Sequence, residues 1–103
     1  MSLNMVITKQ QQDETLTLSV SGRLDTTTAP QLETEIRAIG PDTTELILEL
    51  GELEYISSAG LRVLLSAQKL MNRQGSMVLR HPAEMVMDVF EITGFADILT
   101  IVQ

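Results

Sequence analysis

The sequence predicts an α/β fold: a mixed β-sheet of about four to five strands with about three to four helices packed against it. Residues 15–22 alternate between apolar and polar side chains, which is the pattern of a strand with one buried face. Residues 45–50 are nearly continuously apolar, and after Ile56 the apolar side chains change to helical spacing. With a further strand at residues 77–80, this order implies a right-handed crossover and a parallel strand pair. The whole chain, residues 1–103, is expected to form one domain.

A β-hairpin is expected at the start of the chain. Its strands are residues 3–10 and residues 15–22, joined by the polar residues 11–14. Gly22 is expected to end the second strand, and residues 23–28 then form a loop that is rich in residues favouring caps and turns.

The first helix is predicted to open at Ala29-Pro30, because proline is tolerated in the first turn of a helix. Its buried stripe consists of the apolar residues at helical spacing, which are Ala29, Leu32, Ile36 and Ile39. Gly40-Pro41-Asp42 stops this helix. The strand at residues 45–50 follows, and an apolar run so continuous is typical of a strand covered on both faces, so helices are expected on either side.

The second helix is predicted to have Ser58 as its N-cap and to run to Arg73 or Gln74. Gly75 is expected just beyond its last turn, where helices commonly end in glycine. The unpaired N–H groups of the first turn give the Ser58 end a partial positive charge, which stabilises anions.

The last part of the chain is predicted to contain a strand, a helix and a terminal strand. The strand is residues 77–80, and His81-Pro82 starts the helix, which ends at Gly94. Residues 98–102 form an edge strand or apolar packing at the terminus.

The core is expected to consist mainly of aliphatic side chains, because only 3% of the residues are aromatic and none is tryptophan. Long flexible methionines suit irregular gaps between such side chains. We therefore expect the core to be filled in part by Met71, Met77, Met85 and Met87, the alternative being that they mark an adaptable partner surface.

Charge and composition narrow the range of partners. The chain has 14 acidic and 7 basic residues, a formal net charge of -7, and no run of Lys or Arg. Nucleic acid and an anionic membrane surface are therefore disfavoured as partners, and a basic protein partner fits better. The chain has no cysteine, which is compatible with a reducing compartment. We see no cleavable signal and no apolar run near the roughly 20 residues of a spanning helix, so we predict a cytoplasmic protein.

No arrangement of residues in the sequence supports catalysis. His81 is the one histidine and precedes a proline, which is the usual place of a loop or cap residue. Ser57 and Ser58 lie between strand and helix as in a nucleophile elbow, but the glycine that should precede the serine by two residues is missing. The glutamates within residues 49–54 match no metal-ligand spacing, and no glycine-rich phosphate loop occurs. We expect no enzymatic activity, no metal site and no cofactor.

Two segments carry a resemblance to a known family. They are Gly22-Arg23-Leu24-Asp25 and, after the apolar strand, Tyr55-Ile56-Ser57-Ser58-Ala59-Gly60-Leu61-Arg62-Val63-Leu64-Leu65. Together they resemble the STAS domain, specifically the stand-alone anti-sigma factor antagonists, and the resemblance spans nearly the whole chain. It implies the same mixed sheet with packed helices.

In that family a serine at the start of a helix is phosphorylated by a kinase that is also an anti-sigma factor, and a metal-dependent serine phosphatase removes the phosphate. Aligning Gly60-Leu61 with the Gly-Leu pair of the family implies that Ser58 is the modified residue, with Ser57 as the second choice. Ser57 stands where the family usually has Asp, and Ala59 stands where it usually has a second hydroxyl.

The resemblance thus implies an anti-sigma factor antagonist that binds its kinase when unphosphorylated and is released by phosphorylation. The expected partner surface comprises Asp25, Thr26, Ser57, Ser58, Ala59, Gly60 and Arg62. The alternative is a non-phosphorylated STAS module that serves as a structural subunit of a transporter or of a signalling assembly.

Overall fold

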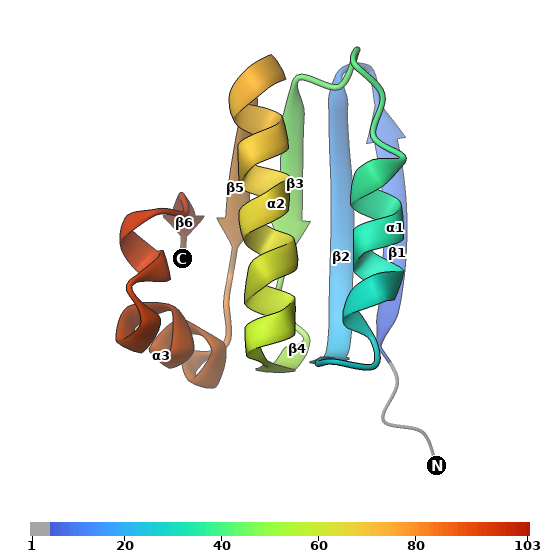
Figure 1. Ribbon diagram of the computed structural model, residues 1–103. Coiled ribbons are helices and arrows are strands. Elements are labelled where there is room, and N and C mark those ends of the chain that lie inside the picture. Colours follow the sequence, from blue (N-terminus) through green and yellow to red (C-terminus); the bar gives the residue numbers. More distant parts are fainter. Residues whose placement is uncertain (1–4) are drawn as a thin grey trace.

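Six strands and three helices make up the structure, a computed structural model that describes residues 5–103 (Figure 1). The strands are β1 (Val6–Gln12), β2 (Thr15–Leu24), β3 (Glu45–Glu49), β4 (Leu53–Ile56), β5 (Ser76–Arg80) and β6 (Ile101–Val102). The helices are α1 (Ala29–Arg37), α2 (Ser58–Gln74) and α3 (Glu84–Thr93), followed by the short 3-10 turn η1 (Phe95–Asp97). The predicted α/β class is confirmed, with more strands than expected because β4 was not predicted. Leu3 and Asn4, the start of the predicted first strand, lie outside the described residues.

The sheet has the strand order β1-β2-β3-β5-β6, and β4 pairs with β2 beside this row. β1 and β2 form the predicted antiparallel hairpin. All other pairs are parallel, including the β3–β5 pair that the crossover through α2 predicts.

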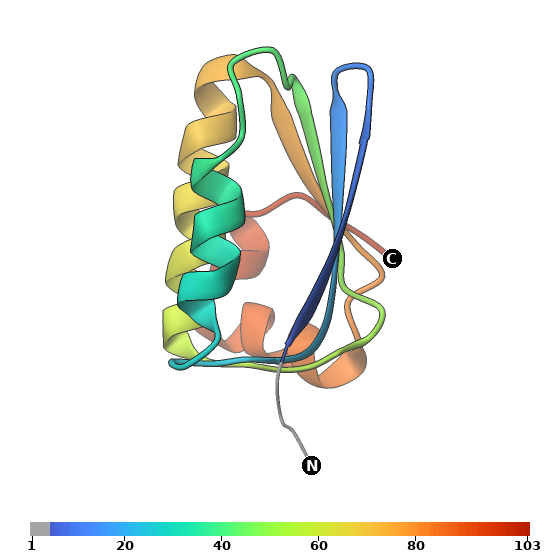
Figure 2. The ribbon, with the colours of Figure 1, turned by 90° about the vertical axis from the view of Figure 1, so that its right-hand side faces the viewer.

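Helices α1 and α2 lie against the same face of the sheet (Figure 2). The prediction that the strand at residues 45–50 is covered on both faces is therefore wrong. Leu46 and Leu48 are fully buried under the helices, whereas Ile47 between them is partly exposed on the other face. Ile47 is paired with Thr17 on β2 and with Val78 on β5, so cross-strand neighbours rather than a helix surround it.

Gly22 continues β2 instead of ending it. The register of β2 shifts between Gly22 and Arg23, and Gly22 has a φ of 92°, in the left-handed region that favours glycine. This bulge lets β2, which pairs with β3 over Thr15–Ser19, pair with β4 over its last residues. The loop before α1 is consequently shorter than predicted and begins at Asp25.

The end of α2 agrees with the sequence prediction, since its last residue is Gln74 and Gly75 is its C-cap. Only glycine fits there, because a Cβ atom on Gly75 would overlap the carbonyl oxygen of Thr44. The Gln74 side chain also donates a hydrogen bond to the Thr43 carbonyl at 2.6 Å. The C-terminal end of α2 is thus anchored to the segment that leads into β3.

Helix α3 begins at Glu84, three residues after His81, where the His81-Pro82 start was predicted. His81 has a φ of 56°, outside the right-handed helical region, and its N–H bonds to the Val102 carbonyl of β6 at 2.9 Å. Of the predicted terminal strand, only Ile101–Val102 is a strand, and it pairs with β5 in parallel.

The core lies between the sheet and the helices and is built mainly from leucines. Met71 and Met77 are buried in it as predicted, whereas Met87 is only partly buried and Met85 is 60% exposed. Within residues 5–103, no helix combines the length and apolar character that crossing a membrane requires.

Candidate partner-binding site

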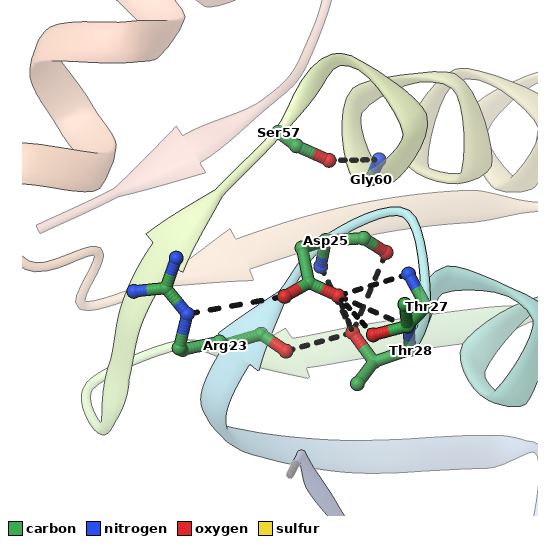
Figure 3. Close-up of polar contacts among 6 residues, drawn as sticks. All are labelled: Arg23, Asp25, Thr27, Thr28, Ser57 and Gly60. Carbon is green, nitrogen blue, oxygen red and sulfur yellow. Dashed lines mark hydrogen bonds and ion pairs between the residues drawn. The ribbon is translucent and has the colours of Figure 1, made fainter. Parts of the chain in front are cut away.

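The predicted site lies where two neighbouring strands end and two helices begin. β2 and β4 run parallel, so their carboxyl ends at Leu24 and Ile56 lie at the same edge of the sheet. The Leu24 carbonyl accepts a hydrogen bond from the Ser57 N–H at 2.9 Å. This bond ties the loop before α1 to the turn before α2, and Figure 3 shows polar side chains of both segments.

Ser57 is the N-cap of α2, so the assignment of Ser58 to that position is wrong. The backbone of Ser57 is extended, with φ -103° and ψ 177°, because it continues the direction of β4 by one residue. Its Oγ accepts a hydrogen bond from the Gly60 N–H at 3.5 Å (Figure 3). Ser58 is the first helical residue, and it is exposed. One hydroxyl therefore caps the helix, and the next faces solvent at its positive end.

Gly60 holds α2 close to the ends of β2 and β4. It is buried, and a Cβ atom at this position would lie 2.6 Å from Cγ of Leu24 and 2.9 Å from Cγ1 of Ile56. Gly60 was predicted as part of the partner surface, but because it is buried it instead packs beneath the other predicted residues and positions its neighbours on either side.

Asp25 organises the loop between β2 and α1. Its Oδ1 accepts hydrogen bonds from the N–H groups of Thr27 at 3.0 Å and Thr28 at 3.2 Å, and from the Thr27 hydroxyl at 2.8 Å (Figure 3). The bond from the Thr27 hydroxyl is the largest cause that holds the pKa of Asp25 below its ordinary value, although desolvation acts in the opposite direction. Arg23 Nε lies 3.8 Å from the other carboxylate oxygen. These contacts give Asp25 a structural role in the loop.

A groove of ≈ 320 Å³ lies between the N-terminal parts of α1 and α2. Its lining consists of Thr26, Ala29, Pro30, Glu33, Ala59, Arg62, Val63 and Ser66. Three of the predicted partner-binding residues thus come together here, Thr26 from the β2–α1 loop and Ala59 and Arg62 from α2. Arg62 is exposed, and within residues 5–103 it forms no ion pair.

Residues 7–102 match the family described as "Mlab, STAS domain". The chain belongs to the STAS domain family. BtrV of Bordetella bronchiseptica, assigned as an anti-sigma factor antagonist, is 40% identical over 99 residues, which are 94% of this chain and 85% of BtrV. The resemblance to the anti-sigma factor antagonists is confirmed.

Solved structures share the fold of this STAS domain. An anti-sigma factor antagonist of Mycobacterium paratuberculosis has a TM-score of 0.83 and 22% identity over 95% of this chain and 85% of its own. SpoIIAA of Bacillus in its phosphorylated form has a TM-score of 0.74 and 19% identity over 95% of this chain and 92% of its own.

Sequence reasoning missed several features at the edge of this STAS domain's site. The Arg23 guanidinium lies over the Tyr55 ring, with Cζ 4.1 Å from the ring centroid, because the two residues are partners in the β2–β4 register. Because β4 was not predicted, nothing in the sequence indicated that Arg23 and Tyr55 are neighbours. Glu33 and Ser66 line the groove, and Ser66 has a local signal, since it follows Arg62 by about one helical turn on α2.

The one histidine of the STAS domain belongs to a different cluster. His81 Nδ1 lies 2.9 Å from Glu49 Oε2, and Arg80 Nε lies 3.3 Å from Glu49 Oε1. Burial raises the pKa of Glu49, but the hydrogen bond and charge of His81, the Gly51 N–H and the charge of Arg80 together outweigh it and leave the pKa below its ordinary value. In the described part of the chain, no three His, Cys, Asp or Glu side chains are grouped so that they could hold a metal.

Proposed function

We propose that this STAS domain is a partner-switching regulator whose affinity for a serine kinase that is also an anti-sigma factor is controlled by phosphate on Ser58. The unphosphorylated form binds the kinase, and the phosphorylated form is released. A metal-dependent serine phosphatase restores the binding form. The switch operates in the cytoplasm. The ATP that supplies the phosphate is bound by the kinase and not by this chain. The 40% identity to BtrV and the known phosphorylated form of SpoIIAA, which has this fold, support the proposal.

The observation that carries the assignment is the different placement of the two serines. The Ser57 hydroxyl is engaged as the helix cap and is partly buried, whereas Ser58 is exposed at the first helical position. A kinase must reach the acceptor oxygen from solvent, so Ser58 is the better acceptor. The cap also fixes the backbone from which Ser58 projects.

The N-terminal end of α2 can accommodate a phosphate without refolding. The first backbone bond of the helix runs from the Leu61 N–H to the Ser57 carbonyl at 2.9 Å, so the N–H groups of Ser58 and Ala59 precede it. Phosphate oxygens are stabilised by such free N–H groups and by the helix dipole. Arg62 follows Ser58 by one helical turn and is exposed, so it is placed to pair with the phosphate.

The same phosphate would oppose binding at an interface. It adds about −1.5 to −2 charges at neutral pH, and burying an unpaired charge costs several kcal/mol. Because each 1.4 kcal/mol is about tenfold in affinity, a penalty of ~3 kcal/mol weakens binding by roughly a hundredfold.

The test is phosphorylation of the purified chain by its candidate kinase with ATP, followed by intact mass measurement. Wild type, Ser58→Ala and Ser57→Ala are compared in parallel, and kinase binding of each is measured without ATP. We expect Ser57→Ala to accept phosphate, and Ser58→Ala to accept none while retaining its affinity for the kinase.

Two results would overturn the assignment. Phosphate on Ser58→Ala combined with none on Ser57→Ala would transfer the switch to Ser57. Absence of phosphate on all three proteins, with the kinase active on another substrate, would instead favour the non-phosphorylated STAS module that serves a transporter or signalling assembly.

A further inference from the structure

Helix α3 carries an apolar stripe that faces solvent. Met85 is 60% exposed and Ile92 is 85% exposed. Seven residues separate them, which places their side chains about 20° apart around the helix, on the same side and two turns apart. Val86 and Phe90 are fully buried on the side that faces the core. Val86 and Phe90 therefore anchor α3 to the core, and the exposed stripe of Met85 and Ile92 does not contribute to this packing.

Acidic side chains flank this stripe. Glu84, Asp88 and Glu91 are all exposed on α3, and Asp97 follows on η1. From Glu84 to the last residue the sequence contains no Lys, Arg or His. An exposed apolar surface bordered by charges of one sign is typical of a site that recognises a partner.

We propose that the α3 face, defined as Met85 and Ile92 with Glu84, Asp88 and Glu91, is a docking surface for a basic amphipathic segment of a partner protein. The partner would place a large apolar side chain on Met85 and Ile92, with Lys or Arg side chains against the three carboxylates. Methionine suits such a contact because its flexible side chain adapts to the shape of an incoming group.

The charges on the α3 face select this occupant over two others. A second copy of the same face would bring like carboxylates together, which opposes a symmetric dimer. An anionic lipid surface would repel the same carboxylates. A basic amphipathic protein segment can cover the apolar stripe and also pair with the carboxylates beside it.

The α3 face is separate from Ser58. Helix α3 packs against β4, the strand that leads into the Ser57 turn, so the two surfaces lie at the same end of the molecule (Figure 1). Neither Ser57 nor Ser58 belongs to the α3 face. Its test therefore does not depend on phosphorylation or on the kinase.

The test is a titration of the ¹⁵N-labelled full chain with a synthetic amphipathic peptide of leucine and lysine, with a leucine and glutamate peptide of the same pattern as control. We expect amide shifts centred on residues 84–92 with the basic peptide and none with the acidic one. Ile92→Gln should weaken binding about tenfold, the equivalent of ~1.4 kcal/mol. Val6→Gln is the matched control, because Val6 is also an exposed apolar residue, 59% accessible on β1, and should bind as wild type does.

A second pair of variants tests whether the basic peptide binds at the α3 face or is attracted only by the net negative charge of the chain. One variant carries Glu84→Gln, Asp88→Asn and Glu91→Gln, and the other carries Asp13→Asn, Asp42→Asn and Glu52→Gln, which remove the same charge elsewhere. We expect the first to lose at least tenfold more affinity than the second.

The proposal is overturned by equal losses in the two triple variants, by shifts spread over the whole acidic surface, or by absence of peptide binding. Sedimentation of the free chain adds one further outcome. Self-association that Ile92→Gln abolishes would mean that a second copy, and not a basic partner, covers the α3 face.

Discussion

Ser57 and Ser58 are chemically identical neighbours, yet the start of α2 places them in different environments. Ser57→Ala removes the oxygen that accepts the Gly60 N–H, so it should lower the free energy of unfolding by about 0.5–1 kcal/mol, the lower part of the range for N-caps, because the bond is long. Ser58→Ala removes an exposed hydroxyl and should change stability by less than about 0.5 kcal/mol. Urea denaturation of both variants measures the difference. Equal losses would show that Ser57 is not the cap in solution.

Gly60 is needed because the side chains of Leu24 and Ile56 leave no room for a Cβ atom at this position. Alanine is the better helix former by about 1 kcal/mol, but its Cβ would meet the side chains of Leu24 and Ile56. We therefore expect Gly60→Ala to lower the free energy of unfolding by about 1–3 kcal/mol, as overpacking does. Gly40→Ala is the control, because a Cβ there has no atom within 4 Å. Urea denaturation that ranks Gly60→Ala as stable as Gly40→Ala would contradict the close packing.

The lowered pKa of Asp25 predicts a pH dependence of stability. The unfolded chain has the ordinary value of about 3.9, and the folded pKa is lower, so the native state binds this proton less readily. The contribution of Asp25 is therefore present above about pH 4 and is lost as the pH falls through the folded pKa. Asp25→Asn keeps an oxygen for the loop N–H groups but removes the charge.

The deficit of Asp25→Asn relative to wild type should accordingly be greatest near pH 7 and shrink toward pH 3. Thermal unfolding of both proteins across this range measures it. Because the comparison is between the two proteins, the titration of Glu49, which also has a lowered pKa, cancels. A deficit that does not change with pH would mean that the charge of Asp25 contributes nothing.

At the scale of elements, the two ends of α2 differ in what they touch. The C-terminal end is anchored through Gln74 and Gly75, whereas the N-terminal end lines the groove and presents Ser58 to solvent. Under the proposed function, partner binding should depend on charge at the N-terminal end only.

Arg62→Gln should therefore weaken binding of the kinase by about tenfold, and Lys69→Gln, two turns further along, should leave it unchanged. Both substitutions remove one positive charge from exposed positions on the same helix, so the change in net charge is matched. Isothermal titration calorimetry with the unphosphorylated chain measures both affinities. Equal weakening would indicate a response to overall charge.

For the molecule as a whole, phosphorylation of Ser58 should act without changing the fold. The core lies on the sheet side of α2, and Ser58 is exposed at its end, so the added charge meets no buried group. We expect amide shifts confined to the β2–α1 loop and the first turns of α2, and a melting temperature within about 4 °C of the unmodified chain. Spectral changes across β3 and β5 would contradict a purely local switch.

The periodicity of the sequence was sufficient for the elements that depend on their own residues. The β1–β2 hairpin, the α1 start at Ala29-Pro30 and the α2 end before Gly75 all follow from apolar spacing and from Pro and Gly. Net charge needs no coordinates, and the basic protein partner that it favours stays a prediction. The family resemblance added the region around Ser58 and Asp25, whose two segments do meet in space.

Other features arise between segments that are distant in the chain, so no local pattern contains them. The position of β4 depends on a bulge at Gly22 that turns β2 toward it. The N-cap of α2 is Ser57 and not Ser58 because of where β4 ends, which the sequence does not show. The fact that α1 and α2 cover only one face of the sheet is a second example. On the other face, Ile47 has cross-strand neighbours beside it and no helix over it. Spacing reports which residues prefer burial, and only long-range packing decides which surface buries them.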